Sequence, residues 1–265
     1  MKNKRFYKRF FLSIFTLFFS ATIPAFADSK NILFNQDFDA QNIDTINISL
    51  IYEDLKISQV YGDEITVEIG SNNLNKIPEI ICQDGTFIIK SKEQKVTRGN
   101  KCTVYLYLPE NLSVMSVSIS NVSGNIQADL LKARNSVIVG NISGRTDIAF
   151  CSTELFNASS TSGNITLQKV TADYFTFGST SGNIFVELQK APLASSKITN
   201  ISGKSQLYYP KNSDFDIAIF SVSGSIKSQG MNSPVSGSTY TQSIGHGGPE
   251  ITISSISGKI EFREY

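Results

Sequence analysis

Residues 121–128 read NVSGNIQA, and near copies of this octapeptide follow further along the chain. A catalytic motif normally occurs once, whereas a motif that returns at a steady interval belongs to a repeat architecture. The other three copies are NISGRTDI at 141–148, STSGNITL at 160–167 and STSGNIFV at 179–186. Counting three later Ser-Gly pairs with similar flanks, the successive spacings are 20, 19, 19, 21, 21 and 34 residues.

Apolar and polar residues alternate on both sides of each Ser-Gly pair. Around Ser162, for example, Phe156 and Ala158 precede the pair, and Ile165 and Leu167 follow it. Period-two alternation predicts two short strands per unit, each with one face turned inward. The chain must bend between them, and glycine allows either a positive φ or a close approach of two backbones. We therefore predict a structural corner at seven glycines: Gly124, Gly144, Gly163, Gly182, Gly203, Gly224 and Gly258.

A unit of about twenty residues with one apolar face cannot bury that face alone, but stacked units bury a continuous core. We therefore expect an all-β, β-solenoid-like fold with rungs of about 20 residues, spaced roughly 4.8 Å apart. The residue two before each repeated serine is always Asn or Ser, which suits a turn and would stack as a polar ladder. A β-sandwich is the alternative, but it does not explain the near-constant spacing.

Before residue 113 the repeat fades, although segments such as EITVEIG and CTVYLYL still alternate as strands do. We predict that 28–112 is an N-terminal β-region of degenerate rungs that caps the stack, and that 113–265 is the Ser-Gly repeat solenoid. Residues 227–250, rich in Ser, Gly and Pro, are expected to be an inserted loop that folds back over the C-terminal end. The charges of the final rung, at 261–265, would discourage edge-to-edge pairing there.

The first 27 residues are typical of a secretory signal peptide. Five basic residues precede an apolar run from Phe10 to Ile23, and Ala25 and Ala27 supply a small-x-small cleavage pattern. The run is short for a membrane span, which needs about 20 residues, and no later segment is apolar enough to form one. An uncleaved N-terminal anchor is the alternative. The prediction is a mature chain 28–265 that is exported to the periplasm, the cell surface or the medium.

Removing the five basic residues of this leader from the 24 in the chain leaves 19 against 23 acidic residues, a formal net charge of −4. A mildly acidic exported protein is a poor candidate for nucleic acid or an anionic membrane surface. Export also permits disulfides, and Cys82 with Cys102 is the favoured pair because both lie in strand-like runs beside a predicted hairpin. Three free cysteines, Cys151 included, are the equally weighted alternative.

The repeats resemble a known family, the bacterial putative adhesins of unknown function, which carry a recurring Val-Ser-Gly-Asp-Ile-like motif. The resemblance covers most of residues 45–265 and implies a right-handed β-helix-like fold in an exported or envelope protein. In this chain Asn, Arg, Ser or Lys replaces the acidic residue that the family often places after the glycine, which argues against cation binding there. The matching stretches are NVSGNI, NISGRT, TSGNIT, TSGNIF, NISGKS, SVSGSI and SISGKI.

Catalysis by a β-helix enzyme needs carboxylates clustered on neighbouring rungs. The best column here holds Asp129 and Glu187 with no carboxylate between them, and Asp147 lies nearby. His246, the only histidine, lies in a Gly-rich loop without a phosphate-binding signature, and no cysteines have zinc spacing. We therefore expect no catalytic, cofactor or metal site.

The expected function is that of a non-enzymatic cell-envelope or surface protein, an adhesin or binding scaffold for a surface polymer, glycan or protein. Phe185, Tyr208 and Tyr209 are candidate ligand-facing aromatics, although strand propensity alone would also explain them. Two other classes stay open: a polysaccharide lyase or hydrolase built on a β-helix, and a periplasmic envelope-stress or assembly factor.

Overall fold

The structure, a computed structural model, describes residues 32–73, 77–92, 102–228, 235–236 and 239–265. Within these ranges every regular element is a strand, which confirms the predicted all-β class. No helix in the described part of the chain is long and apolar enough to cross a membrane. The predicted signal peptide, 1–27, lies outside the described residues. Residues Asn31–Tyr265 form one compact unit, without a division near residue 112.

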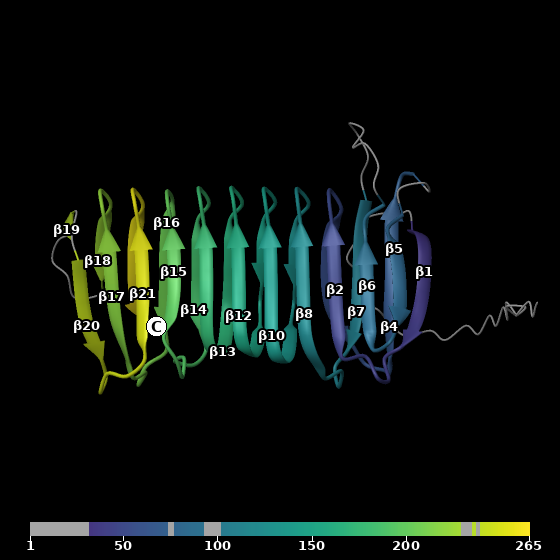
Figure 1. The fold of residues 1–265 in the computed structure, drawn as a ribbon, viewed down its shortest axis with the longest axis horizontal. Helices are drawn as coiled ribbons and strands as arrows, with labels where there is room; N and C mark the ends of the chain where they lie inside the picture. The colour runs from purple at the N-terminus through teal and green to yellow at the C-terminus, as the bar shows by residue number, and fades with distance from the viewer. Residues whose placement is uncertain (1–31, 74–76, 93–101, 229–234, 237–238) are drawn as a thin grey trace, which may run out of the picture. The chain divides into compact units, whose positions relative to one another are not determined.

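The strands stand side by side in two rows of one folded sheet (Figure 1). In spatial order the first row is β5 (Glu79–Gln83), β6 (Thr86–Lys90), β2 (Thr45–Leu50), β8 (Val114–Asn121), β10 (Leu131–Asn141), β12 (Cys151–Ser160), the later half of β13 (Ile165–Ser179), β15 (Ser196–Asn200), β21 (Glu250–Ser255), β17 (Phe215–Ser221) and β20 (Thr239–Ile244). We use "rung" for one strand of this row together with the strand that follows it in the second row.

The strands of the second row are given in the same order, starting from the same end of the stack. Its strands are β1 (Ile32–Asp39), β4 (Glu64–Ser71), β7 (Cys102–Pro109), β3 (Asp54–Val60), β9 (Ile126–Ala128), β11 (Thr146–Ile148), the start of β13, β14 (Ile184–Leu188), β16 (Lys204–Tyr209), β22 (Lys259–Glu264), β18 (Ser225–Ser228) and β19 (Val235–Ser236). Pairing is parallel through the middle of both rows and antiparallel only near their ends.

The register places corresponding residues of the repeats against one another. Val117 faces Val137, which faces Phe156, which in turn faces Phe175. All four side chains are at most 2 % exposed and belong to one continuous core between the two rows. Period-two alternation therefore has the predicted consequence, because one side of every strand is buried and the other is solvated.

The seven glycines stack in a column where the chain turns from the first row to the second. A Cβ atom added to Gly163 would lie 1.9 Å from the carbonyl oxygen of Gly144, and one added to Gly144 would lie 1.9 Å from that of Gly124. Of the seven, only Gly203 has a positive φ, at 131°. Close approach of one rung's backbone to the next is therefore the reason that this column requires glycine.

Side chains beside these glycines join each corner to the preceding one. The Ser143 hydroxyl donates to the carbonyl oxygen of Val122 at 3.0 Å. Asn141 donates from Nδ2 to the carbonyl oxygen of Gly124 at 3.0 Å and accepts from the Gly144 amide at 3.1 Å. The asparagines of the expected ladder thus reach a backbone carbonyl of the preceding corner, whereas a ladder serine such as Ser160 accepts only from the glycine amide of its own corner. Both satisfy polar groups that the tight turn would otherwise leave unpaired.

The N-terminal segment does not simply cap the stack. The rung formed by β2 and β3 lies between two other rungs, one formed by β6 and β7 and one formed by β8 and β9. These two flanking rungs follow one another in sequence. At the corner between β2 and β3, Glu53 takes the place of Ser-Gly, and its carboxylate accepts hydrogen bonds from the amides of Ile51 and Tyr52 and from the Ser91 hydroxyl. Residues 45–57 are therefore a complete internal rung.

The prediction for the C-terminal end was wrong in two respects. The final rung, β21 and β22, lies between the rung of β15 and β16 and the rung of β17 and β18, so it is not an edge. Residues 227–250 are not only loop, since β20 pairs antiparallel with β17 and β19 pairs with β18. Figure 1 shows β21, in yellow, between the green β15 and β17. An exposed row of backbone donors and acceptors on β17 explains why β20 covers it.

All three cysteines are free, so the expected Cys82–Cys102 bond does not form in this structure. Cys82 is exposed on β5 in the first row, whereas Cys102 is buried on β7 in the second row, where it faces Ser71. Burial raises the pKa of the Cys102 thiol to about 12, with a further contribution from Glu53. The two thiols belong to different rows, because β5 pairs with β6 in the first row and β7 pairs with β4 in the second.

Candidate functional site

An aromatic and charged patch occupies the outer side of the second row near its C-terminal end. We call Phe185, Tyr208 and Arg263, which come from β14, β16 and β22, the aromatic platform. Alternation directs them outward: Phe185 lies between the buried Ile184 and Val186. The three strands are consecutive in the row, so side chains of three rungs meet on one surface.

The platform side chains contact one another closely. The rings of Phe185 and Tyr208 have centroids 5.0 Å apart and an interplanar angle of 81°, an edge-to-face contact. The Arg263 guanidinium carbon lies 4.1 Å from the centroid of the Tyr208 ring. Gln206 Nε2 lies 3.2 Å from the Tyr208 hydroxyl. Tyr208 is therefore held from three directions, with its ring half-buried against the sheet.

An ion pair borders the platform. Lys204 Nζ lies 2.8 Å from Glu261 Oε2, and only 18 % of the Glu261 side chain is exposed. The hydrogen bond from Lys204 lowers the pKa of Glu261; partial burial opposes this shift, and the charges of Lys204, Lys259 and Lys227 add to it. Glu261 is therefore held as a carboxylate beside the platform.

This pair gives a testable pH dependence. Because the pKa of Glu261 is lower in the folded chain than in the unfolded chain, the pair stabilises the fold above the unfolded value and loses its effect as pH falls through the folded value. We expect Glu261→Gln to reduce the free energy of unfolding by about 0.5–1 kcal/mol at about pH 7, after allowing for solvent screening. Urea titrations at about pH 7 and below about pH 4 should show this difference shrinking at the lower pH. A constant difference at both pH values, or one equal to that of the exposed Glu154→Gln, would contradict the assignment.

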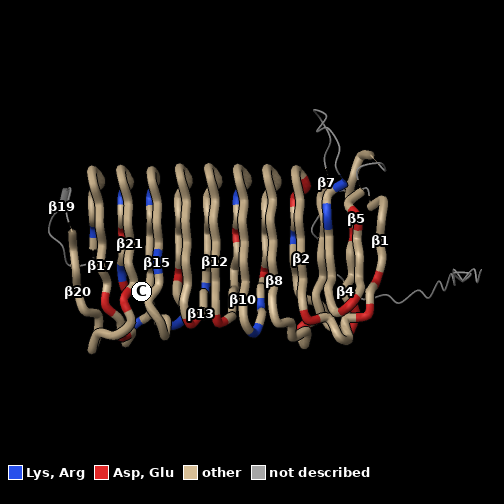
Figure 2. Tube along the Cα trace, viewed as in Figure 1, with Lys and Arg blue, Asp and Glu red and all other residues tan. Residues whose placement is uncertain are grey.

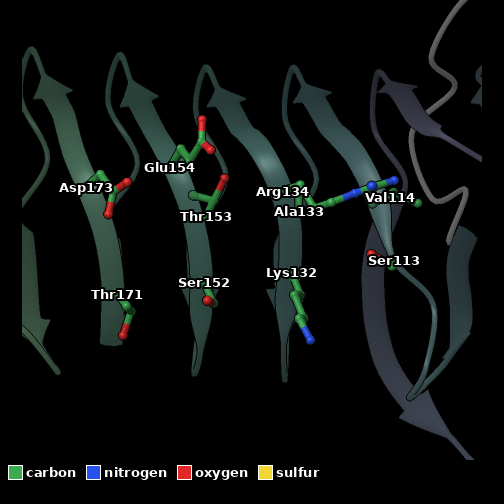
Figure 3. A pocket seen from close by; sticks show the side chains of 10 residues that line it. All are labelled: Ser113, Val114, Lys132, Ala133, Arg134, Ser152, Thr153, Glu154, Thr171 and Asp173. Atoms are coloured by element: carbon green, nitrogen blue, oxygen red, sulfur yellow. The ribbon is translucent and has the colours of Figure 1, made fainter.

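A shallow groove of about 300 Å³ is the second candidate site. It crosses the early parts of β10 and β12 and the middle of β13, and its lining includes Lys132, Arg134, Glu154 and Asp173. The Arg134 side chain extends away from the two acidic residues, toward Val114 (Figure 3). The hydroxyl of Thr153, in the same groove, is buried without a hydrogen-bond partner. The groove carries mixed charge but no aromatic side chain, so it lacks the apolar contact surface that the platform offers.

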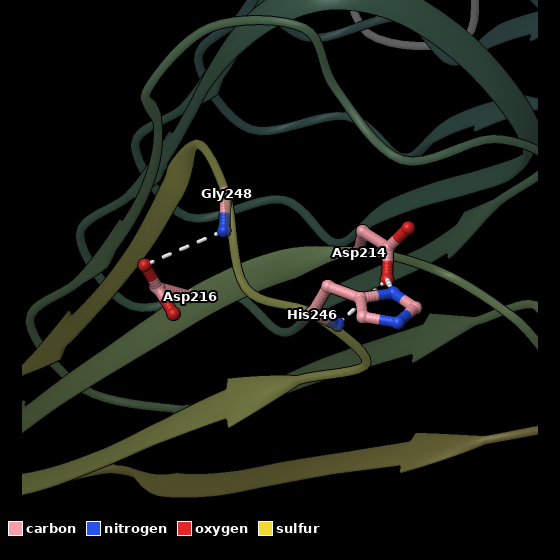
Figure 4. Close-up of polar contacts among 4 residues, drawn as sticks. All are labelled: Asp214, Asp216, His246 and Gly248. Carbon is pink, nitrogen blue, oxygen red and sulfur yellow. Dashed lines mark hydrogen bonds and ion pairs between the residues drawn. The ribbon is translucent and has the colours of Figure 1, made fainter.

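His246 takes part in contacts that hold the loop 245–249 against the start of β17. Its ring is 95 % exposed; its Nδ1 lies 3.1 Å from Asp214 Oδ1, and its amide donates to the same oxygen at 2.8 Å (Figure 4). The Gly248 amide donates to Asp216 Oδ2 at 3.5 Å. Hydrogen bonds from His246 lower the pKa of Asp214. The two carboxylates therefore fix the loop's backbone.

Two of the three carboxylates considered for catalysis are bound to separate partners. Asp129 accepts from the Ser58 hydroxyl at 2.7 Å, and Asp147 pairs with Arg145 at 2.6 Å. Glu187 lies on β14, opposite Tyr208. Among the described residues no three His, Cys, Asp or Glu side chains converge as a metal site. Most positions along the described rungs are uncharged, and acidic and basic positions both occur among them (Figure 2).

Of the three aromatics that the sequence suggested, the structure brings Phe185 and Tyr208 together and separates Tyr209 from them. Tyr209 is 7 % exposed, and its ring lies 5.1 Å from that of Phe215 in the core. Arg263 was missed. It stands six residues after Ser257 just as Tyr208 stands six after Ser202, so the aligned repeats place both in one column. The missing information was that these two rungs are neighbours.

These features define an all-β protein whose strands stack in the manner of a β-solenoid. Residues 43–194 match the family model described as Toastrack DUF4097, which is more than half of the chain, and the protein belongs to this family. No curated protein matches the chain.

The chain is also similar, at low identity, to several crystal structures. A putative adhesin from Bacteroides fragilis NCTC 9343 is 14% identical with a TM-score of 0.46, and the match covers 86% of this chain and 96% of that one. A putative cell adhesion protein from Clostridium sporogenes ATCC 15579 is 12% identical with a TM-score of 0.41, covering 87% and 98%. A putative lipid binding protein from Parabacteroides distasonis ATCC 8503 is 16% identical with a TM-score of 0.46, covering 86% and 95%. Likeness at this level carries no functional argument.

Proposed function

We propose that the protein is an exported, non-enzymatic binding scaffold of the cell envelope, an adhesin in the broad sense, and that the aromatic platform binds a glycan. The observation that carries this proposal is the contact of Phe185, Tyr208 and Arg263 on one outer surface. Export rests on the composition of residues 1–27, and a right-handed winding with regular rungs of about 20 residues remains part of the proposal.

The platform suits a sugar ring because it offers two different kinds of contact. Outside the area that the Arg263 guanidinium covers, the part-buried rings of Phe185 and Tyr208 together present an apolar surface that suits the C–H face of a pyranose. Around it, Gln206 and Arg263 carry planar N–H donors, and Glu261 carries acceptors for hydroxyl groups. Binding sites of this kind combine a mainly apolar surface with a few polar groups that fix orientation.

The chemistry of the platform favours binding over cleavage of a glycan. Glycoside hydrolysis needs one carboxyl group that keeps its proton and acts as general acid. Glu261 has the opposite property, since Lys204 lowers the pKa of its carboxyl group. This supports a binding scaffold over the lyase or hydrolase alternative. Binding of a glycan would also distinguish the scaffold from an envelope-stress or assembly factor, which needs no external ligand.

Removal of the tyrosine ring tests the proposal. With an array of bacterial and host oligosaccharides as probes, we expect the mature protein to bind a subset, and Tyr208→Ala to weaken Kd about tenfold, equivalent to about 1.4 kcal/mol. Tyr174→Ala is the matched control, because Tyr174 is 41 % exposed on the first row. An array without binding, or equal losses for Tyr208→Ala and Tyr174→Ala, would contradict the assignment of the platform.

A further inference from the structure

The C-terminal rung fills a slot between two rungs that follow one another in sequence. β21 pairs in parallel with β15 on one side and β17 on the other, and β22 pairs likewise with β16 and β18. Residues 250–265 are thus hydrogen-bonded along both edges. Four of their side chains are 0 % exposed and complete the core at this point: Ile251, Ile253, Ile260 and Phe262.

The slot is matched to this segment and not to the rung that precedes it in sequence. In the register of the second row, Phe262 lies opposite both Leu207 and Ser228, and Glu261 lies opposite Lys227. If β18 took the place of β22, a serine would replace the buried phenylalanine and a lysine would replace the partner of Lys204. The edge of β15 and β16 therefore selects residues 250–265 by core packing and by charge.

A short loop connects this rung to the rest of the chain. We call residues 245–249 the hinge loop; it crosses the start of β17, where Asp214 and Asp216 hold it (Figure 4). Gly245, Gly247 and Gly248 all have positive φ there. Both carboxylates make their contacts at the exposed surface, where each contact contributes little free energy to holding the loop. Five extended residues reach roughly 17 Å, several times the distance between rungs.

We propose that the slot also accepts the C-terminal rung of a second copy, so that two chains exchange residues 250–265 and form a closed dimer. The exchanged form repeats every contact of the slot, and its additional costs are the hinge rearrangement and association. The added rung supplies main-chain hydrogen bonds on both edges, as in strand complementation. Until residues 250–265 of either chain arrive, the edge of β15 and β16 is open.

The exchange would change the platform. Arg263 travels with the exchanged rung, whereas Phe185 and Tyr208 stay with the parent chain. Each platform of the dimer would therefore contain groups from both chains, and two platforms would be joined in one particle. A polymeric ligand could then be held at two points, which raises the effective affinity. The exchange itself does not depend on glycan binding.

Cysteine trapping in the full-length protein tests the exchange. Thr199 and Ser254 face each other across β15 and β21, with their hydroxyls 3.3 Å apart. Thr199→Cys and Ser254→Cys would be placed on separate, differently tagged chains that are produced in the same cells. Both chains carry Cys82→Ser, which removes the exposed native thiol. A third protein, with both new cysteines on one chain, measures how much disulfide forms when residues 199 and 254 are adjacent.

The matched control places Asn157→Cys and Thr176→Cys on separate chains. These residues face each other across β12 and β13, in the middle of the stack and outside the exchanged segment. We expect a disulfide-linked heterodimer of twice the monomer mass, joined through residues 199 and 254, and its absence for the control pair. Asp214→Asn with Asp216→Asn should increase its fraction by releasing the hinge loop. A heterodimer yield no greater than that of the control pair would overturn the proposal.

Discussion

Gly163→Val should lose more than about 4 kcal/mol of the free energy of unfolding, enough to leave little folded protein at ordinary temperature. The added Cβ would lie 1.9 Å from the carbonyl oxygen of Gly144 and 3.0 Å from the Ser160 hydroxyl. The Gly144 carbonyl belongs to a rung that is paired on both sides, and the Gly144 amide donates to Asn141 Oδ1, so the carbonyl cannot move without disturbing the hydrogen bonds beside it. Circular dichroism during heating and in urea measures the loss.

Gly178→Ala is the matched control for this prediction. Gly178 is the second-to-last residue of β13. A Cβ atom there would meet its nearest neighbour, the Thr199 carbonyl oxygen, at 4.0 Å. We expect no loss, or a gain of about 0.4–1 kcal/mol from reduced freedom of the unfolded chain. If Gly163→Val were as stable as Gly178→Ala, close backbone approach would not be what the corner column requires.

The corner and the alternation could be predicted because both are local properties of the chain. The side-chain period fixes which residues face inward, so Phe156 and Phe175 could be placed in the core from spacing alone. The same period separates Tyr208 from Tyr209, since successive residues of a strand point to opposite sides. Applied strictly, it would have assigned Tyr209 to the core and left Phe185 and Tyr208 as the surface pair.

The order of the rungs could not be predicted, because the backbone edge of every rung offers a similar set of donors and acceptors. The corner sequences SVSGSI at 221–226 and SISGKI at 255–260 are nearly identical in character. Neither indicates which of the two rungs pairs with β15 in the stack. The discriminating residues stand a few positions later, where Ser228 and Phe262 occupy the same column. A serine in a column that is otherwise apolar was the available signal.

The rung at residues 45–57 could not be recognised from the sequence for a different reason. Ile46 and Ile48 alternate as an ordinary strand does, but Glu53 stands at the corner in place of the Ser-Gly pair. Its buried carboxylate caps two backbone amides, a role that the sequence motif does not describe. A repeat defined by its Ser-Gly pair therefore makes residues 45–57 a degenerate unit, although they pair on both sides like any internal rung.

Phe262→Ala should lose about 3–5 kcal/mol, the range expected when a fully buried phenylalanine leaves a cavity that its surroundings fill only in part. Phe262 is 0 % exposed, stands between Leu207 and Ser228 in the register, and has the ring of Tyr240 at 5.6 Å. The loss should appear as a lower urea midpoint with an unchanged slope, since the rest of the fold still unfolds as before.

The comparison with Phe220→Ala makes this a test of the rung order. Phe220 lies on the neighbouring β17 but is 45 % exposed on the outer side, so its removal should cost far less. If the rungs followed the sequence, residues 259–264 would end the stack with one edge open, and Phe262 would contact a neighbouring rung on one side only. Its replacement would then cost little more than that of Phe220. A large difference between the two variants therefore requires residues 250–265 to lie inside the stack, the arrangement on which both the platform and the exchange depend.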